Sequence, residues 1–206
     1  MKLAIYDSIK TESTSDIRTQ RLHESIIHRI EEIVPSFKDR FTIHPEEKVK
    51  DPINKTGKFK VDSLIKVKSN KEFHTFILVK APVSNVAQNE GNYAAAQVLD
   101  SIRLRFYHPN TNILFITICG NNPPYFKDKG KFHKIESPTL KALYNAKEMV
   151  NDPKAYSAVV RYDLDIPKFK NKIEFRDKIV KNSIKNIKDG EFNRCVEKIF
   201  GPTPVG

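Results

Sequence analysis

The chain contains no long apolar run. Its 206 residues include no stretch that approaches the roughly 18 consecutive apolar residues of a membrane-spanning helix. The first residues, Met1 to Asp7, also lack the apolar segment of a secretory signal peptide. We therefore expect a soluble intracellular protein without a membrane partner.

Cysteine and glycine are scarce. Cys119 and Cys195 have no Cys or His beside them at metal-ligand spacing, so they are predicted to be buried thiols rather than zinc ligands or a disulfide. None of the seven glycines belongs to a GxxxxGK[ST] phosphate-binding loop, which argues against a nucleotide-driven mechanism. His108-Pro109-Asn110 lacks the paired preceding histidine of a ββα-metal nuclease and predicts a turn.

Basic residues, by contrast, are abundant. The chain has 36 Lys and Arg against 25 Asp and Glu, a net charge of +11, and 39% hydrophobic residues. That composition is apolar enough for one compact domain over residues 1–206 and basic enough for a polyanionic partner, with nucleic acid the leading candidate. Residues 127–206 hold 18 of the Lys and Arg but only 11 of the Asp and Glu, so the excess charge lies toward the C-terminus.

Hydrophobic periodicity predicts a mixed α/β order in the first 120 residues. A helix over residues 18–34 is closed by Pro35, because the residue before a proline disfavours helical geometry. Runs rich in β-branched and aromatic residues predict strands at 41–44, 59–67, 73–80 and 112–119. The last two, with a helix between them, predict a parallel βαβ crossover.

That connecting helix is predicted to begin in the region of residues 85–90 and to end near Phe106. Its predicted buried stripe consists of Ala95, Leu99, Ile102 and Phe106.

The remainder is predicted to be helix-rich, with a helix over residues 140–150, a strand over 157–164 and a helix over 172–188. The last helix would place lysines on one side, and these are Lys178, Lys181, Lys185 and Lys188. Such a stripe is either a solvated face or a contact surface for phosphates.

Asp62 and Lys80 fall on adjacent predicted strands, with the lysine at the end of its strand and a polar helix start just after it. An acid and a lysine so placed suit metal-dependent phosphodiester cleavage. The element order αβββαβ, together with these two residues and the polar block from Lys80 to Asn92, resembles the core of the PD-(D/E)xK nuclease superfamily, to which many Type II restriction endonucleases belong. The resemblance covers about residues 18–120 and leaves about 121–206 for DNA recognition and dimerisation.

The chain departs from that family's pattern at two positions. Val61 stands where the family has a proline that carries no chemistry, and Leu78 stands where the family has a metal-binding Glu or Asp. Three explanations remain open. The carboxylate has moved to Glu90 on the following helix, it comes from Glu24 or Glu31 on the first helix, or the site is inactive and the chain binds DNA without cutting it.

The resemblance implies a Mg²⁺-dependent double-stranded DNA endonuclease, with Mn²⁺ as a substitute, in the cytoplasm of a bacterial or archaeal cell. Asp62 and Glu90 are the expected metal ligands, and Lys80 is expected to position the attacking water. A Type II enzyme that cuts a two-fold symmetric site and leaves 5′-phosphates is expected to be a homodimer. Gln88, Asn89 and Asn92, together with Lys178, Lys181 and Lys185, are candidate DNA contacts. The alternatives are a non-catalytic DNA-binding protein on the same scaffold and a structure-selective nuclease resembling a junction resolvase.

Overall fold

The computed structural model describes residues 1–10, 16–70 and 74–201, and it gives the backbone alone for Ala4 and residues 16–19. Its α-helices are α1 (Lys2–Lys10), α2 (Asp16–Ile33), α3 (Phe37–Arg40), α4 (Val86–Tyr107), α5 (Lys141–Val150), α6 (Lys172–Lys178) and α7 (Gly190–Phe200). Its strands are β1 (Phe41–Pro45), β2 (Lys48–Lys50), β3 (Lys58–Lys60), β4 (Ser63–Val67), β5 (His74–Lys80), β6 (Asn112–Gly120), β7 (Pro124–Lys127), β8 (Lys131–Ile135), β9 (Ala155–Leu164) and β10 (Ile184–Lys188). No described helix is both long and apolar enough to cross a bilayer.

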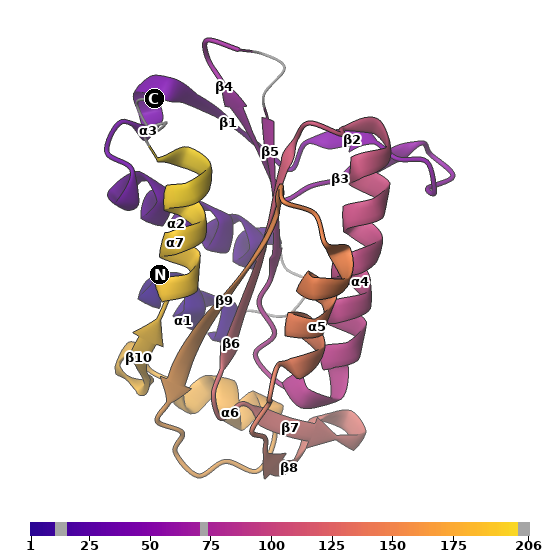
Figure 1. Cartoon of the computed structure of the whole chain (residues 1–206). Helices are drawn as coiled ribbons and strands as arrows, with labels where there is room; N and C mark the ends of the chain where they lie inside the picture. The colour runs from indigo at the N-terminus through magenta and orange to yellow at the C-terminus, as the bar shows by residue number, and fades with distance from the viewer. Residues whose placement is uncertain (11–15, 71–73, 202–206) are drawn as a thin grey trace.

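Six strands form a mixed sheet in the order β1-β4-β5-β6-β9-β10. The three strands β5, β6 and β9 run parallel, whereas β1, β4 and β10 each pair antiparallel with their neighbours. Helices α1, α2 and α7 cover one face and α4 and α5 the other, while α6 and the β7–β8 hairpin lie at the end where the parallel strands stop (Figure 1). The predicted α/β class, a central mixed sheet flanked by helices, is confirmed.

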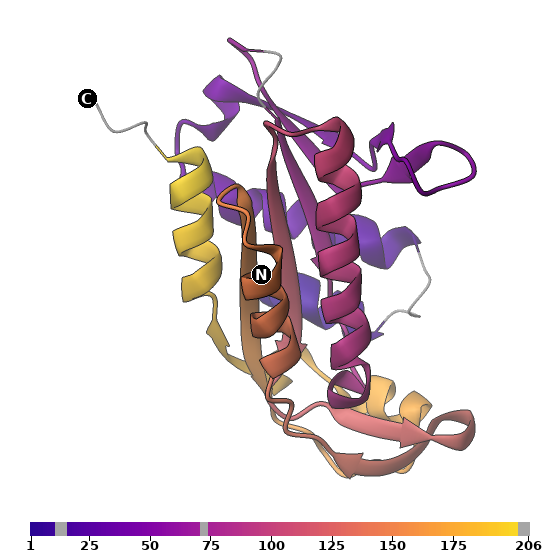
Figure 2. The same ribbon diagram turned by 45° about the vertical axis from the view of Figure 1, so that its right-hand side comes forward.

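The predicted order of helix, three strands, helix and strand is also present, as α2, β1, β4, β5, α4 and β6. The crossover through α4 makes β5 and β6 parallel, and Lys80, the last residue of β5, is level with Thr117 of β6. Two hairpins extend from this frame at opposite ends of α4, β2–β3 at one end and β7–β8 at the other (Figure 2).

The two faces of the sheet are packed differently. Under α1, α2 and α7 lies a large apolar cluster that includes the fully buried rings of Phe37, Tyr162 and Phe200. Two smaller clusters lie on the opposite side, one beside α4 and one between α4 and α5. Cys119 is buried, which raises its pKa to about 11, and Cys195 is half-buried; both are free thiols.

The predicted strand at 59–67 is wrong at its centre, because the run divides there. Its first part, β3, pairs with β2 in a separate two-stranded sheet, and its second part, β4, joins the main sheet between β1 and β5. Asp62 therefore lies in the break between β3 and β4, rather than within a strand. A hydrogen bond of 3.0 Å from the main-chain N–H of Glu46 to the carbonyl oxygen of Asp62 holds this corner in place.

The predicted helix at 172–188 is also wrong. Only Lys172–Lys178 is α-helical, and a 3₁₀ turn at Lys181–Ser183 leads into β10. β10 pairs antiparallel with β9, with an irregularity between Lys185 and Lys188, so the lysines do not form a helical stripe. The part after residue 120 is mixed rather than helix-rich, since its described residues form four strands as well as three α-helices. The N-terminal helix α1 was not predicted at all.

The predicted buried stripe of α4 is wrong as well. Leu99, Ile102 and Phe106 are 45%, 62% and 68% exposed, and Ala95 is exposed too. The face that α4 buries is largely polar and includes Glu90, Gln97, Asp100 and Ser101. Glu90 and Gln97 on that face have hydrogen-bond partners at the start of α5 and on β9, and Asp100 pairs with Arg103 of α4 itself, which compensates for their removal from water.

Candidate active site

Asp62 lies against the end of β5, where the antiparallel pairing of β4 with β5 brings the two segments together. The register aligns Ser63 with Ile77, so Asp62 comes level with the stretch that leads to Lys80. Its Oδ2 atom accepts a hydrogen bond from the main-chain N–H of Val79 at 2.5 Å. The structure thus brings the predicted acid next to the lysine-bearing strand.

His23 of α2 is the side chain that completes this corner, and the sequence analysis missed it. Its Nε2 atom lies 3.4 Å from Oδ1 of Asp62, and the residue is only 7% exposed. A signal was present, because His23 precedes Ile26 by three residues and Ile30 by seven, which places it on the buried stripe of the helix. A polar residue on an apolar face needs a partner, and here the partner is Asp62.

Lys80 is the last residue of β5, and its side chain is exposed. Its positive charge acts on the carboxyl group of Asp100 of α4. Burial raises the pKa of Asp100, and the positive charges of Arg103 and Lys80 oppose that rise. Arg103 donates to Asp100 at 3.1 Å and also pairs with the fully buried Asp51. Asp100 is therefore paired with Arg103, and its interaction with Lys80 is a longer-range electrostatic one.

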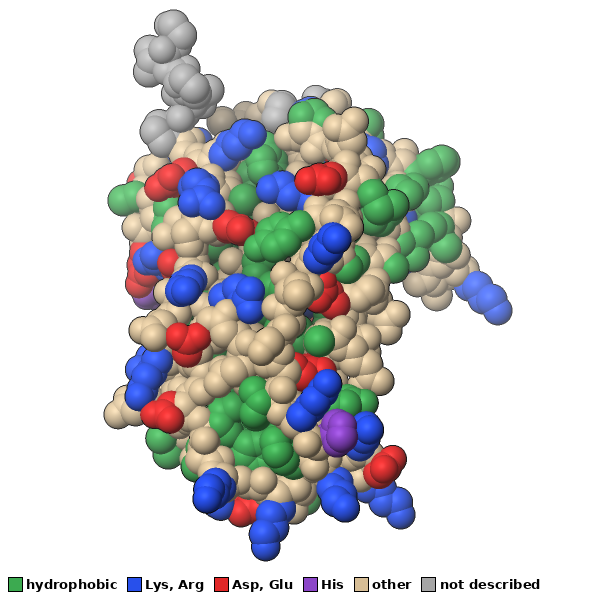
Figure 3. Space-filling view, turned by 60° about the horizontal axis from the view of Figure 1, so that its bottom comes forward, with side chains coloured by type: hydrophobic (Ala, Val, Ile, Leu, Met, Phe, Trp, Pro, Cys, Tyr) green, Lys and Arg blue, Asp and Glu red, His purple; other side chains and the backbone are tan. Residues whose placement is uncertain are grey.

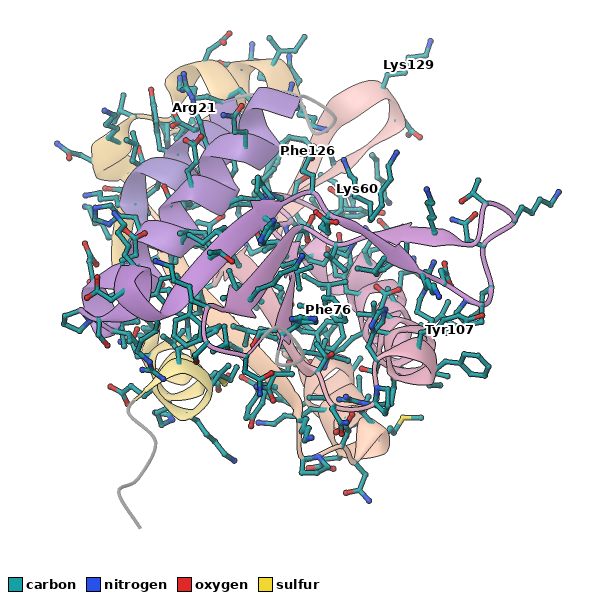
Figure 4. The ribbon with its side chains drawn as sticks, turned by 90° about the horizontal axis from the view of Figure 1, so that it is seen from above. Arg21, Lys60, Phe76, Tyr107, Phe126 and Lys129 are labelled. Carbon is teal, nitrogen blue, oxygen red and sulfur yellow. The ribbon has the colours of Figure 1, made fainter. Side chains whose placement is uncertain are left out.

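Leu78 occupies the position at which the resemblance implies a second carboxylate. It is 6% exposed and belongs to the apolar cluster under α4, whose other buried members are Val49, Val61, Leu64, Phe76, Leu104, Ile113 and Phe115. Phe76 of this cluster lies inside the fold in the view from above (Figure 4). The position is thus part of the core, and an ionised carboxylate there would lose its hydration without a partner.

Glu90, the expected second metal ligand, has a structural role. Its Oε1 accepts from the Ala142 N–H at 2.7 Å and its Oε2 from the Leu140 N–H at 3.1 Å. These amides belong to the start of α5, where the first N–H groups have no partners within the helix. Both oxygens of Glu90 are therefore used as a cap for α5 from the neighbouring helix.

Glu24 and Glu31, the acids considered on the first helix, line a cavity of about 560 Å³ between α2 and the β1 edge, together with His23 and Glu46. Glu24 accepts from Gln20 at 2.8 Å, and Glu31 pairs with Lys38 at 3.1 Å. In the described part of the chain, no three His, Cys, Asp or Glu side chains are grouped so that they could hold a metal ion. Mg²⁺ keeps several waters and is commonly held by one or two carboxylates with substrate phosphates, so Asp62 fits an ion shared with DNA.

The candidate DNA contacts on α4 have two different environments. Asn92 is exposed, whereas Asn89 donates to the Asn85 carbonyl at 2.8 Å and Gln88 accepts from the Asn85 side chain at 3.4 Å. Asn85 also exchanges two hydrogen bonds with the main chain of Phe126. The polar block after Lys80 therefore fastens the β7–β8 hairpin to the start of α4.

The three candidate lysines of the C-terminal part lie on separate elements. Lys178 pairs with Glu174, Lys185 pairs with Asp165, and Lys181 lies 6.0 Å from the centre of the Tyr6 ring. The structure does not bring them together as a stripe.

A basic surface is found instead at the β7–β8 hairpin and the neighbouring loop before α6. Exposed lysines of this surface are Lys127, Lys129, Lys131, Lys134, Lys168 and Lys170. Basic side chains surround a group of hydrophobic side chains at this end of the molecule (Figure 3), where Phe132, Ile135 and Phe169 line a hollow. Lys129 extends outward from the hairpin tip (Figure 4). Lysines interspersed with aromatic rings suit the phosphates and bases of a nucleic acid.

No protein-family model matches this chain, and no curated protein matches it. Among solved structures, the chain is similar to an XisH family protein from Nostoc punctiforme, with 17% sequence identity and a TM-score of 0.32. The match covers 67% of this chain and 91% of that one. A likeness at this level carries no argument about function, so the functional proposal rests on the site itself.

Proposed function

We propose that the protein is a metal-dependent endonuclease that hydrolyses phosphodiester bonds in double-stranded DNA. The observation that carries the proposal is the contact between Asp62 and the end of β5, which places a half-buried carboxylate beside the strand that ends in an exposed Lys80. An acid and a cation so arranged can act on a phosphodiester from adjacent positions.

Each residue of the corner has a separate role in this proposal. Asp62 holds Mg²⁺, or Mn²⁺ in its place, and His23 fixes the orientation of the Asp62 carboxylate through its Nε2 contact. Bound there, the ion would polarise the phosphate and lower the pKa of a coordinated water. Lys80 attracts the phosphate and stabilises the negative charge that develops on it. The leaving group is the 3′ oxygen, so the product carries a 5′-phosphate.

The basic end of the molecule supports DNA as the substrate. The parallel strands β5, β6 and β9 stop at this end, so β5, whose last residue is Lys80, ends on the side of the molecule where the β7–β8 hairpin lies (Figure 1). Duplex DNA could contact the hairpin lysines through its backbone while a phosphate lies at Lys80. A site-specific Type II enzyme that acts as a homodimer is the finer form of the proposal.

A second candidate function, DNA binding without cleavage, is favoured by two observations. Leu78 fills the second carboxylate position with a buried apolar side chain, and Glu90 is occupied at α5. Such a protein would bind DNA through the basic surface but would not hydrolyse phosphodiester bonds.

A plasmid assay separates the two functions. The purified protein is incubated with supercoiled plasmid, with linear duplex and with a four-way junction, each in Mg²⁺, Mn²⁺ or EDTA. Discrete fragments with either metal, lost in Lys80→Ala and retained in the exposed control Lys198→Ala, support the endonuclease. Retarded but intact DNA under every metal condition contradicts it and supports the binding protein. Cleavage of the junction alone would identify a structure-selective nuclease.

A further inference from the structure

The outward face of α4 has the composition of a protein interior. Leu99, Ile102 and Phe106 are exposed there, although the same helix buries Glu90 and Asp100 on its other side. The helix lies at the outside of the molecule, beside α5 (Figure 2). An exposed apolar face on a helix whose polar side is packed against the fold indicates a surface that another molecule covers.

This face has no charged side chain. Among the exposed residues of Val86–Tyr107, all of which the structure describes, the side chains with polar atoms are the uncharged ones of Gln88, Asn92 and Tyr107. The two arginines at the margin, Arg103 and Arg105, pair with aspartates of the same chain. Charged residues make up 30% of the sequence, so their absence from this face argues against a partner that is held by charge, such as a nucleic acid.

The shape of the face changes along the helix. Its first half carries residues with at most a methyl group, one turn apart, at Ala87, Gly91 and Ala95. Apart from the chain neighbours and the backbone of the helix, no described atom lies within 4 Å of the position that a Cβ of Gly91 would occupy. The second half carries the large side chains of Leu99, Ile102 and Phe106 on the same side, because spacings of three and four residues share one helix face. The face is therefore low in its first half and high in its second half.

A second copy of α4 fits this shape. Two antiparallel copies related by a two-fold axis near the middle of the helix bring each large side chain level with a small residue of the other copy. The approximate pairs are Leu99 with Ala95, Ile102 with Gly91 and Phe106 with Ala87, and each pair occurs twice because a two-fold interface is isologous. An uncharged face also suits self-association, since each chain carries a net charge of +11 and like charges in the interface would repel. We propose that α4 is the interface of a homodimer in which the two copies of the helix pack antiparallel.

The proposed dimer has a consequence for Lys80. Lys80 precedes α4 by six residues, and the 22 residues of α4 span about 33 Å. Antiparallel packing therefore places the two copies of Lys80 at opposite ends of the helix pair, where they would act on separate DNA segments. A homodimer that closes on one symmetric site would need another interface. The inference does not rest on the proposed function, because self-association is measured without DNA.

The test compares Ile102→Lys with Ile173→Lys, which places the same side chain at an exposed isoleucine of α6. Sedimentation equilibrium measures the dissociation constants of the wild type and both variants, in low and in high salt. The wild type and Ile173→Lys are expected to dimerise, and the dissociation constant of Ile102→Lys should rise about a hundredfold or more, as for the loss of a central interface residue. High salt should strengthen the wild-type dimer, because it screens the repulsion between two basic chains.

Thermal unfolding checks that each variant folds, and if Ile102→Lys does not, Ala95→Arg carries the same comparison. A wild type that stays monomeric up to about 1 mM, or equal dissociation constants in Ile102→Lys and the wild type, overturns the proposal. Binding of a monomeric wild type to phosphatidylcholine vesicles, lost in Ile102→Lys, also overturns it and assigns the face to a lipid surface.

The orientation of the helices is tested with Gly91→Cys and Ile102→Cys, each combined with Cys195→Ser to remove the half-buried thiol. In the antiparallel dimer a disulfide should form only when the two variants are mixed. Position 91 then lies beside position 102 of the other copy, whereas like positions are about 16 Å apart along the helix axis, too far for a disulfide. Disulfides that form within each variant alone would show parallel packing and overturn the proposed arrangement.

Discussion

Asp62 and Glu90 are both predicted metal ligands, but their carboxylates have different environments in the structure. Asp62 lies at the corner beside β5, and Glu90 lies at the junction of α4 and α5. The Asp62 side chain is 28% exposed and accepts one main-chain N–H, with a histidine at its other oxygen. Glu90 is 8% exposed, and a helix start uses both of its oxygens. A carboxylate can thus lie close in sequence to a site lysine and still serve the fold rather than the site.

The largest expected effect is the loss of DNA cleavage when Asp62 is replaced, because only the Asp62 corner is proposed to take part in the chemistry. Asp62→Asn keeps the size of the side chain but removes its charge, so DNA cleavage with Mg²⁺ should fall by about a thousandfold or more, comparable to the loss of a major charge-stabilising group. Rates are measured from plasmid linearisation under single-turnover conditions. Asp165→Asn, at an exposed acid, is the control and should cut like the wild type. Full cleavage by Asp62→Asn would remove the corner from the chemistry.

Leu78→Glu tests whether the corner can accept a second carboxylate. Placing an acid in the apolar cluster under α4 should destabilise the fold by about 3 kcal/mol or more, since burial strongly disfavours the charged form. Urea unfolding measures the loss, and Leu78→Met, which conserves volume, should cost less than about 1.5 kcal/mol. A stable Leu78→Glu protein with faster cleavage would show that this position belongs to the site after all.

Glu90→Gln tests the structural side of the comparison. One of the two amides at α5 loses its charged acceptor, so the free energy of unfolding should fall by about 2 kcal/mol. Cleavage by the folded protein should be unchanged. Glu148→Gln, at an exposed acid of α5, provides the matched control and should unfold like the wild type. The opposite pattern, normal stability with lost cleavage, would return Glu90 to the metal site.

A smaller effect concerns Asp51, a buried carboxylate whose role is structural because it pairs with Arg103. The hydrogen bond from Arg103 lowers the pKa of Asp51 below its ordinary value. A lowered pKa contributes stability above the unfolded-state value of about 3.9, and this contribution is lost as the pH falls through the folded-state pKa. The stability of Asp51→Asn should therefore depend less steeply on pH in the acid range than that of the wild type, as measured by acid unfolding followed by circular dichroism. An unchanged acid profile would show that the pair with Arg103 adds nothing.

The sequence predicted five of the six strands of the main sheet, and the crossover follows from the nearly continuous apolar runs of β5 and β6 with a helix between them. The run at 59–67 was harder, since the pairing of β3 with β2 depends on residues about ten positions upstream. The helical spacing continues from α6 into residues 184–188 by coincidence, because these residues form β10 and pair with β9. On α4, periodicity identifies an apolar stripe, but this stripe is exposed. The helix buries a largely polar face instead, and the partners of its side chains cannot be read from the periodicity.

The candidate site was predicted in part for a similar reason. Asp62 and Lys80 follow from strand order, because adjacent antiparallel strands must bring them together. His23 and the role of Glu90 depend on contacts between distant segments, 39 residues apart for His23 and Asp62 and about 50 apart for Glu90 and the start of α5. Neither contact has a local sequence pattern.

Binding of Mn²⁺ in the presence of a short duplex tests the central claim most directly, since it reads metal binding at Asp62 without requiring cleavage. Calorimetric titration of the wild type, Asp62→Asn and Glu90→Gln should show one DNA-dependent site in the wild type and in Glu90→Gln, and none in Asp62→Asn. Retention of the site in Asp62→Asn together with its loss in Glu90→Gln would contradict the account.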